Sequence, residues 1–424
     1  MLPDRRRSNA VCRMTQVPAA SPASADIGPG HQDGTREDWL VVGTSTICLA
    51  VSTIHVYSMG VFLLPIERDL GWSRGEISSG LTIASIVSVI CAPFIGALVD
   101  HIGSRRVALP GIILYCLAIV ALGFASSSIG SWWALWLLVS AGTILIKITV
   151  WMAAIAKRFN RRRGVAFAIA LTGTGIGAAI LPTLATALIG AFGWRQAYAI
   201  LGLGGLAIAL PLLFVFFRDA KPLAAGILRA DMPGVDTREG LTSKVFFRLA
   251  ISTLIAMTTI IALSVHFVPM MIHAGLSATM AAAIAGAIGI SSIIGRLLSG
   301  FLLDRFHGPY IGALGLGLPL VVCILLLGFD GSPISATVIA VLIGISLGAE
   351  TDVVAFLASK YFGLRNYGTL FGTLAGLLAL GGGMGPLLAG TIYDHFGSYE
   401  PLLWALIPAS ALSALLTATL GRYP

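Results

Sequence analysis

The chain has 424 residues, of which 57% are hydrophobic and only 11% are charged, and its mean hydropathy is +0.91. Soluble domains carry about 25% charged residues, so this composition excludes an ordinary soluble protein and indicates a membrane protein. The formal net charge is +8. Such an excess serves either nucleic-acid binding or membrane orientation, and the positions of the basic residues decide between them.

The chain begins with a polar segment, residues 1–38, which contains three consecutive arginines and several Pro and Ser residues but no apolar core of a signal peptide. This composition predicts a disordered cytoplasmic tail. The only other long hydrophilic stretch is 218–244. We interpret it as a cytoplasmic loop between two domains.

The rest of the chain consists of apolar stretches, and a helix needs about 20 apolar residues to cross about 30 Å of hydrocarbon. Twelve stretches meet this requirement, at residues 39–64, 76–99, 107–125, 131–157, 164–190, 194–217, 245–273, 277–302, 309–328, 333–361, 366–392 and 399–420. We therefore expect twelve transmembrane helices.

The second six stretches repeat the first six. Residues that recur after 204 positions include the pairs Pro65 and Pro269, Gly96 and Gly300, and Asp100 and Asp304. A period this long indicates a duplicated domain. The predicted fold is an all-α membrane protein built from two six-helix repeats, residues 39–217 and 245–424.

Basic residues concentrate on one side of the predicted membrane. If the N-terminus is cytoplasmic, 22 of the 27 Lys and Arg residues lie in inner segments, and only Arg68, Arg74 and Arg195 lie in outer loops. The positive-inside rule then predicts that both termini are cytoplasmic. The net charge is thus an orientation signal and gives no reason to expect nucleic-acid binding.

The two remaining basic residues, Lys147 and Arg296, lie inside predicted helices. They precede the polar helix ends at Lys157 and Asp304 by ten and eight residues, which places them about 15 and 12 Å deep. A guanidinium near the membrane centre costs at least about 2.5–3.5 kcal/mol, so it must face protein or water. Arg also matches a carboxylate with two parallel hydrogen bonds. These cations predict a site for an organic anion, with structural ion pairs as the alternative.

Neighbours on the same helical faces extend this candidate binding site. Ser292 lies one turn from Arg296, and Trp151 lies one turn from Lys147, so each pair shares a face of a continuous helix. A cation beside an aromatic ring suits an organic carboxylate, although a Trp in a membrane helix commonly only packs.

Two acids, Glu350 and Asp352, lie in the tenth predicted helix at the depth of the cations. Residues two apart point about 200° away from each other, so both cannot face one cavity squarely. The repeat aligns Glu350 with Lys147 within one residue. This alignment favours Glu350 as the proton carrier or counter-ion and Asp352 as a packing partner, with Arg296 as a candidate neighbour.

Two histidines, His55 and His266, lie toward the outer side of the first and seventh predicted helices. Imidazole titrates near neutrality and can sense or relay protons. A structural hydrogen bond is the alternative role, and His266 is the stronger proton candidate because Pro269 follows it in a helix expected beside the cavity.

The segment from Gly96 to Arg106, between the second and third predicted helices, resembles the cytoplasmic loop signature of the major facilitator superfamily. Its residues are Gly96, Asp100, Gly103, Arg105 and Arg106, and a weaker second copy contains Asp304 and Arg305. The resemblance implies a gating loop that clamps one conformation by charge pairing.

A narrower resemblance is carried by Tyr57-Ser-Met-Gly, Gly71-Trp-Ser-Arg74 and Gly295-Arg296. These stretches are similar to bacterial relatives of monocarboxylate porters and oxalate:formate exchangers. Animal porters of this type carry Lys where this chain has Tyr57 and Asp where it has Ser292. Despite these two differences, the resemblance implies a small carboxylate substrate, and it adds Tyr57 to the candidate binding residues.

We expect a secondary transporter, not an enzyme, that moves a small monocarboxylate-like anion across a bacterial cytoplasmic membrane by alternating access and proton coupling. It should act as a monomer and need no cofactor or metal. An exporter of amphiphilic compounds and a carboxylate exchanger are alternatives. A membrane receptor that binds without transporting is the alternative from another class.

Overall fold

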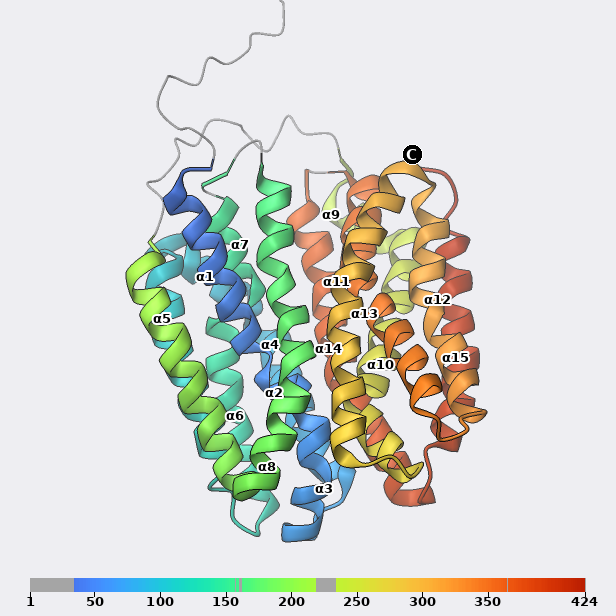
Figure 1. Ribbon diagram of the computed structural model, residues 1–424. Coiled ribbons are helices and arrows are strands. Elements are labelled where there is room, and N and C mark those ends of the chain that lie inside the picture. The colour runs from blue at the N-terminus through green and yellow to red at the C-terminus, as the bar shows by residue number, and fades with distance from the viewer. Residues whose placement is uncertain (1–33, 157, 160–161, 219–233, 364, 424) are drawn as a thin grey trace, which may run out of the picture.

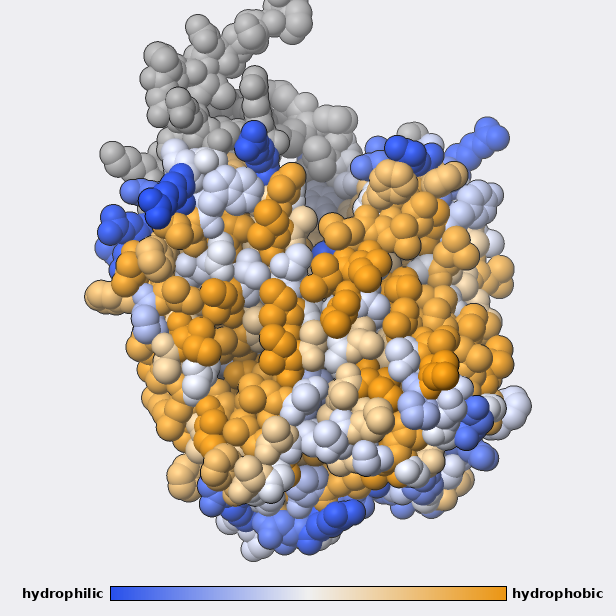
Figure 2. Space-filling view, in the orientation of Figure 1, coloured by the Kyte–Doolittle hydropathy of each residue, from blue (hydrophilic) through white to orange (hydrophobic). Residues whose placement is uncertain are grey.

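The computed structural model describes residues 34–156, 158–159, 162–218, 234–363 and 365–423. The described residues form helices, and their only β-structure is an isolated bridge between Gly234 and Gly363. The helices stand side by side in two groups, the N-terminal group on the left and the C-terminal group on the right of Figure 1. Figure 2 shows a hydrophobic belt between two hydrophilic ends, the surface expected of a multi-pass membrane protein.

The first group contains α1 (Arg36–Ser52), α2 (Ile54–Tyr57), α3 (Met59–Leu70), α4 (Arg74–Ile102), α5 (Ser104–Leu122), α6 (Ile129–Leu145), α7 (Ile148–Ala156) and α8 (Arg163–Phe216). Within α8, Gly193 has φ 79° and ψ 165°, a conformation that glycine adopts without a Cβ clash. The chain turns there, so α8 comprises two crossings, residues 163–192 and 194–216.

The second group contains α9 (Thr237–Thr242), α10 (Lys244–His273), α11 (Ala278–Arg305), α12 (Gly308–Leu327), α13 (Pro333–Phe362), α14 (Tyr367–Phe396) and α15 (Glu400–Ala418). Eleven helical runs in the described part of the chain are long and apolar enough to cross a membrane. Because the run of α8 turns at Gly193, these make twelve crossings. The all-α, twelve-helix prediction is confirmed.

The first and fourth crossings are interrupted, where the sequence predicted continuous helices over 39–64 and 131–157. The first is divided at Thr53 and Ser58, and the fourth is broken between α6 and α7, where Lys147 lies outside both helices. The matching crossings of the second group, α10 and α13, run unbroken for 30 residues each. The two groups are therefore not structural copies at the level of single helices.

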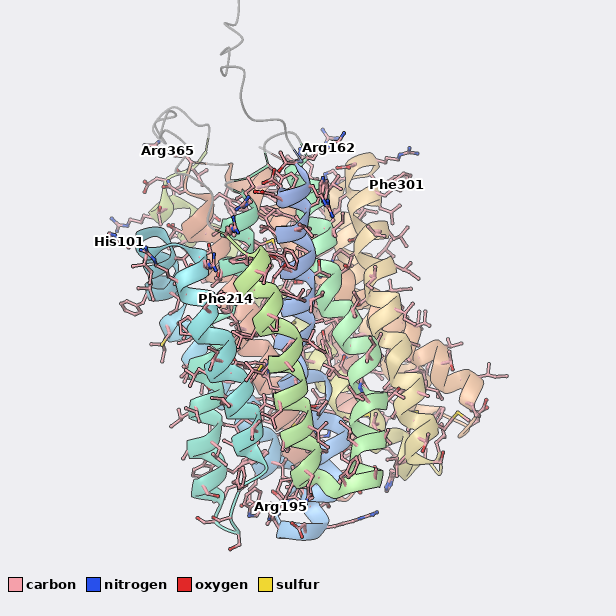
Figure 3. All side chains as sticks on the ribbon, turned by 60° about the vertical axis from the view of Figure 1, so that its left-hand side comes forward. His101, Arg162, Arg195, Phe214, Phe301 and Arg365 are labelled. Carbon is pink, nitrogen blue, oxygen red and sulfur yellow. The ribbon has the colours of Figure 1, made fainter. Side chains whose placement is uncertain are left out.

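Both ends of the described chain lie at the same end of the bundle (Figure 1). We call this end the terminal side and the other end the opposite side. Figure 3 shows Arg162 and Arg365 at the terminal side and Arg195 at the opposite side.

The two groups meet along two seams, α4 against α14 and α8 against α11. Glycines permit the close approach: a Cβ on Gly383 would collide with Ser85 of α4, and a Cβ on Gly175 would collide with Ile293 of α11. Small residues at helix contacts bring backbones together in this way in membranes.

Five hydrogen bonds between described residues join the two groups, and each lies either at the middle of the bundle or at its opposite side. They are Arg74 N and Gly75 N to Asp394, Arg74 Nη1 to Tyr399, Thr82 Oγ1 to the carbonyl of Gly383, and Thr183 Oγ1 to the carbonyl of Ala282. These contacts join the two groups at the middle and at the opposite side.

Candidate functional site

Arg296 of α11 forms an ion pair with Asp352 of α13. Nη1 of Arg296 lies 2.8 Å from Oδ1 of Asp352, and the two side chains are 16% and 28% exposed. The helices approach closely here, because a Cβ on Gly348 would collide with the Ser292 carbonyl. This is the pairing with Arg296 that the sequence raised for Asp352.

The Arg296 side chain points away from the lipid. The residues around it on the outer surface of α11 are apolar and exposed: Ile294, Leu297, Leu298 and Phe301 are 44–60% exposed. Tyr57, on α2 of the first group, lies within electrostatic range of the Arg296 charge. Arg296 therefore faces the space between the two groups, and only Nη1 of its guanidinium is engaged by Asp352.

Ser292 lies on the same face as Arg296 and is 8% exposed. Its hydroxyl donates a hydrogen bond of 2.8 Å to the carbonyl of Gly289 in its own helix. Its hydrogen is therefore committed to the backbone, while its oxygen can still accept a hydrogen bond.

Lys147 occupies the break between α6 and α7. It is half-buried, and its side chain forms no hydrogen bond or ion pair with a described residue. Its carbonyl accepts a 2.9 Å hydrogen bond from Val150 N, which starts the nine-residue α7 directly after it. An unpaired cation thus lies beside the N-terminus of a half-helix, where the helix dipole also favours negative charge.

Trp151 is fully buried in this conformation. Its indole nitrogen donates a 2.8 Å hydrogen bond to the carbonyl of Ile146, which the break has released from the helix. Its ring packs edge-on against Phe217 at 5.2 Å. The sequence predicted one continuous helix through Lys147 and Trp151. The break lies instead at Ile146 and Lys147, so Trp151 is the fourth residue of α7 and Lys147 directly precedes that helix.

Glu350 of α13 is 1% exposed, and neither of its carboxyl oxygens has a hydrogen-bond partner in the described part of the chain. It lies between Leu347, which packs against Ala256 and Ile260 of α10, and Val354, which clusters with Leu249 of α10. Since α10 and α13 run in opposite directions, Glu350 lies level with the equally unpartnered Thr253. Its carboxyl group therefore lies at the contact of α13 with α10.

His55 forms a structural contact inside the first group. Its Nδ1 lies 3.0 Å from the hydroxyl of Tyr115 on α5, and its ring meets the edges of Tyr115 and Trp136. The Tyr115 hydroxyl also donates to the carbonyl of Ser52, at the interruption of the first crossing. Tyr115 therefore holds the irregular stretch of the first crossing in place.

The opposite side contains a polar cluster that the sequence analysis missed, which we call the latch: Glu67, Arg74, Tyr393, Asp394, Tyr399 and His266. Arg74 is 5% exposed. Its Nε lies 3.0 Å from Glu67, its Nη1 donates to Tyr399 at 2.7 Å, and its guanidinium stacks on Tyr393 at 3.6 Å. The carboxylate of Asp394 accepts the N–H groups of Arg74 and Gly75 at the start of α4.

His266 of α10 completes the latch. Its ring is fully buried, with Nδ1 2.9 Å from the Tyr399 hydroxyl and Nε2 3.0 Å from the carbonyl of Pro386. Arg74 in a predicted outer loop gave no sequence signal for this cluster, because Asp394 and Tyr399, which it contacts, lie about 320 positions away in the chain.

A small cavity lies between the two groups, beyond Arg296 toward the opposite side. It has a volume of about 20 Å³, which is room for about one water molecule. Its polar groups are Tyr57 and Ser264, whose hydroxyl has no partner within the described residues. The rest of its lining is apolar or glycine, and includes Ala178, Ala285 and Ile288.

The loop residues that the sequence assigned to gating lie at the terminal side. Arg105 donates a 2.7 Å hydrogen bond to the carbonyl of Phe214 in the first group, Arg106 and Asp304 are exposed, and Arg305 stacks on Phe301 of its own helix. Gly103 has φ 91°, which lets the chain turn between α4 and α5. Gly96 lies within α4, but its surroundings and the side chain of Asp100 fall outside the described residues.

The family model described as Major Facilitator Superfamily matches residues 45–386. The chain belongs to this superfamily. It is therefore a membrane transporter and not an enzyme, and the two groups of helices with a site between them are the arrangement expected of a duplicated transporter.

Among curated proteins, this superfamily member is similar to monocarboxylate transporter 11 of Homo sapiens, with 27% identity over 409 residues that cover 92% of this chain and 83% of the relative. It is also 26% identical to monocarboxylate transporter 13 of Bos taurus, over 85% of this chain and 84% of the relative. An MFS-type transporter of Gibberella moniliformis is 26% identical over 86% of this chain and 85% of its own. These relatives support a place in the monocarboxylate branch.

Among solved structures, the chain resembles a bacterial homolog to the human lysosomal transporter Spinster in its inward-facing and unoccupied conformation. The TM-score is 0.66 with 17% identity, and the match covers 91% of this chain and 95% of the other. At this identity the likeness shows the fold.

Proposed function

We propose that the protein is a secondary active transporter that moves a small organic monocarboxylate by alternating access, driven by protons. The observation that carries this proposal is the Arg296 guanidinium, which faces the space between the two groups with one nitrogen on Asp352 and the rest of its fork unengaged by a described acid. A carboxylate is the ligand that such a fork fits best.

The charges around the site favour a monoanion. Arg296 and Asp352 cancel, which leaves Lys147 as a cation uncompensated by any described acid, while Glu350 is buried without a partner among the described residues. An ionised carboxylate is costly to bury unpaired, so this environment suits a neutral carboxyl group. One net positive charge matches one substrate carboxylate, and Tyr57 offers a hydroxyl donor beside it, while Ser292, whose hydrogen is bonded to the Gly289 carbonyl, offers only an acceptor.

The cavity next to Tyr57 is too small for a long apolar tail. Its volume of about 20 Å³ and its lining of Ala178, Ala285 and Ile288 leave no room there for an extended tail, which favours a small substrate held at Arg296. The names of the two monocarboxylate transporters agree with this class of substrate.

We expect the coupling protons to bind to buried side chains that can gain and lose a proton. Glu350 is the proposed carrier, with Asp352 as the second acid, because Asp352 can be released from Arg296 when a substrate anion takes its place. His266 is a third proton site, within the latch. The contacts of His55 inside the first group favour a structural role for it over proton transfer.

The terminal side is proposed to be cytoplasmic. The helix ends and loops on that side contain Arg105, Arg158, Arg248, Lys360 and Arg422, among others, whereas the opposite side contains Arg68, Arg74 and Arg195, the asymmetry that the positive-inside rule describes. With the latch closed, the protein then faces inward, and the loop with Asp100, Arg105 and Arg106 would clamp the outward-facing state. A bacterial cytoplasmic membrane and a monomer complete the proposal.

The test is uptake of ¹⁴C-labelled acetate, lactate and pyruvate into proteoliposomes, with and without an inward pH gradient. Arg296→Lys keeps the charge but loses the planar fork. It should weaken substrate binding by about 1.5–3 kcal/mol, which is about ten- to 150-fold.

Arg238→Lys, on the short α9 away from the site, is the matched control and should behave as the wild type. Equal affinities for the wild type and Arg296→Lys would remove Arg296 from the substrate site. Binding of a labelled acid without any uptake would favour a receptor, and uptake of amphiphilic cations instead of carboxylates would favour an exporter.

A further inference from the structure

The hydrogen bonds through His266 have a fixed direction. Arg74 can only donate, so the Tyr399 oxygen accepts from Nη1, and the Pro386 carbonyl can only accept, so Nε2 of His266 donates. The hydrogen of the Tyr399 hydroxyl is then directed to Nδ1 of His266. Burial raises the pKa of Tyr399 above its usual range, against the lowering effect of Arg74, so this phenol keeps its proton.

The closed latch therefore contains a neutral His266 with its proton on Nε2. A second proton on Nδ1 would point at the Tyr399 oxygen and displace the phenolic hydrogen, for which no other acceptor is found among the described residues. It would also place a second positive charge one phenol away from Arg74, in a ring that is fully buried.

The other charged groups around His266 do not compensate for that charge. Glu67 of α3 is bound to the Arg74 side chain, and Asp394 of α14 accepts two backbone N–H groups of α4. Tyr393 stacks on the Arg74 guanidinium, and His273 of α10 lies beyond it, 3.5 Å from the Tyr393 hydroxyl. Both acids, Glu67 and Asp394, therefore bind groups of α4, and the hydrogen-bond partners of the imidazole are Tyr399 and Pro386.

Opening the latch reverses this chemistry. When Arg74 leaves Tyr399, the phenol oxygen becomes free to accept a hydrogen bond from Nδ1–H. Water reaches the ring at the same time, and the positive charge of Arg74 moves away. The open latch therefore accepts a proton that the closed latch excludes.

We propose that His266 is a proton-binding site that must be empty on Nδ1 before the opposite side can close. A proton taken up from the opposite side would hold the latch open, and its release would permit closure. The link to transport rests on the proposed function, whereas the latch chemistry does not. The hydrogen bond from Nε2 to Pro386 connects the site to α14 at the seam with α4, next to Gly383 and Gly385.

The sign of the pH effect follows from linkage. The closed state is favoured at high pH and is lost as pH falls, because only the open state binds the second proton. For one proton, the ratio of open to closed molecules increases by at most about tenfold for each unit by which the pH falls.

The experiment measures this ratio without substrate. Spin labels at Ser128→Cys and Ile334→Cys, on the opposite side of the first and second groups, report the distance between them in lipid nanodiscs from pH 5 to pH 8, in a background without the native cysteines. The long-distance population should grow as pH falls. In His266→Gln, whose amide can still donate to Pro386, it should not respond to pH.

His395→Gln is the control, since His395 is an exposed histidine on the same side and should leave the response unchanged. Tyr399→Phe is the second test, because the open latch then lacks the phenol oxygen that would accept from Nδ1–H, so the two states differ less in proton affinity and the pH response should weaken. A wild type without a pH response, or a wild-type response retained in His266→Gln or Tyr399→Phe, overturns the proposal. An intact response together with absent carboxylate uptake would instead refute the substrate assignment.

Discussion

The ion pair between Arg296 and Asp352 gives the sharpest test of the site, through the substitution Asp352→Asn. At an N–O separation of 2.8 Å, with an effective dielectric constant of about 20, the Coulomb attraction is about 6 kcal/mol. Desolvation and the ordering of both side chains offset most of it, which leaves about 1.5–3 kcal/mol for a charged hydrogen bond. Since both partners are partly exposed, we expect the lower end of this range as the loss of stability.

The same substitution should strengthen substrate binding. An anion on the free part of the guanidinium would lie about 6–8 Å from the Asp352 carboxylate, where two like charges repel by about 2–3 kcal/mol at that dielectric constant. Halving this value for partial exposure gives about 1–1.5 kcal/mol, or about five- to thirteenfold tighter binding.

The assay combines thermal unfolding of the purified protein with equilibrium binding of labelled lactate in nanodiscs. Asp352→Asn should unfold at a lower temperature and bind more tightly, whereas Arg296→Lys should bind more weakly. If Asp352→Asn weakens binding as much as Arg296→Lys does, then Asp352 positions the guanidinium or contacts the substrate, and the reasoning from charge competition is wrong.

Two further substitutions separate the roles of the other charged groups. Glu350→Gln mimics a permanently protonated carboxyl group, so it should abolish pH-driven accumulation in proteoliposomes while counterflow exchange continues; accumulation that persists would direct the test to Asp352. Lys147→Gln removes a cation without a partner in the described structure, so it should weaken binding of labelled lactate by about 1 kcal/mol or more and leave the unfolding temperature within about 2 °C of the wild type. A large loss of thermal stability would instead show that Lys147 supports the break in the fourth crossing.

The latch and the seams explain how one conformation is selected. Gly383 and Gly390 of α14 bring its backbone against α4, and Asp394 then reaches the first N–H groups of α4. These N–H groups have no partner within their own helix, so the carboxylate satisfies their hydrogen bonds. Its negative charge also interacts favourably with the positive end of the helix dipole. Closure of the opposite side thus depends on a few polar contacts supported by close glycine packing.

The sequence by itself determined the number of crossings and the charged residues that lie inside the apolar runs, and it indicated the duplication. Long apolar runs have only one stable arrangement in a bilayer, and Lys or Arg inside such runs stands out because of its insertion cost. Arg296, Lys147 and Glu350 were all found in this way.

Tertiary structure decided what each charge meets. Periodicity placed Lys147 and Trp151 in one continuous helix, but the helix is interrupted at Ile146 and Lys147, where the Trp151 indole donates a hydrogen bond to the released carbonyl of Ile146. Repeat symmetry aligned Glu350 with Lys147, yet α13 is unbroken where the fourth crossing is not, and the neighbours of Glu350 pack against α10 of the same group. The latch joins Arg74 to Asp394 and Tyr399 across more than 300 positions, and such contacts depend on how helices pack, which local sequence patterns do not encode.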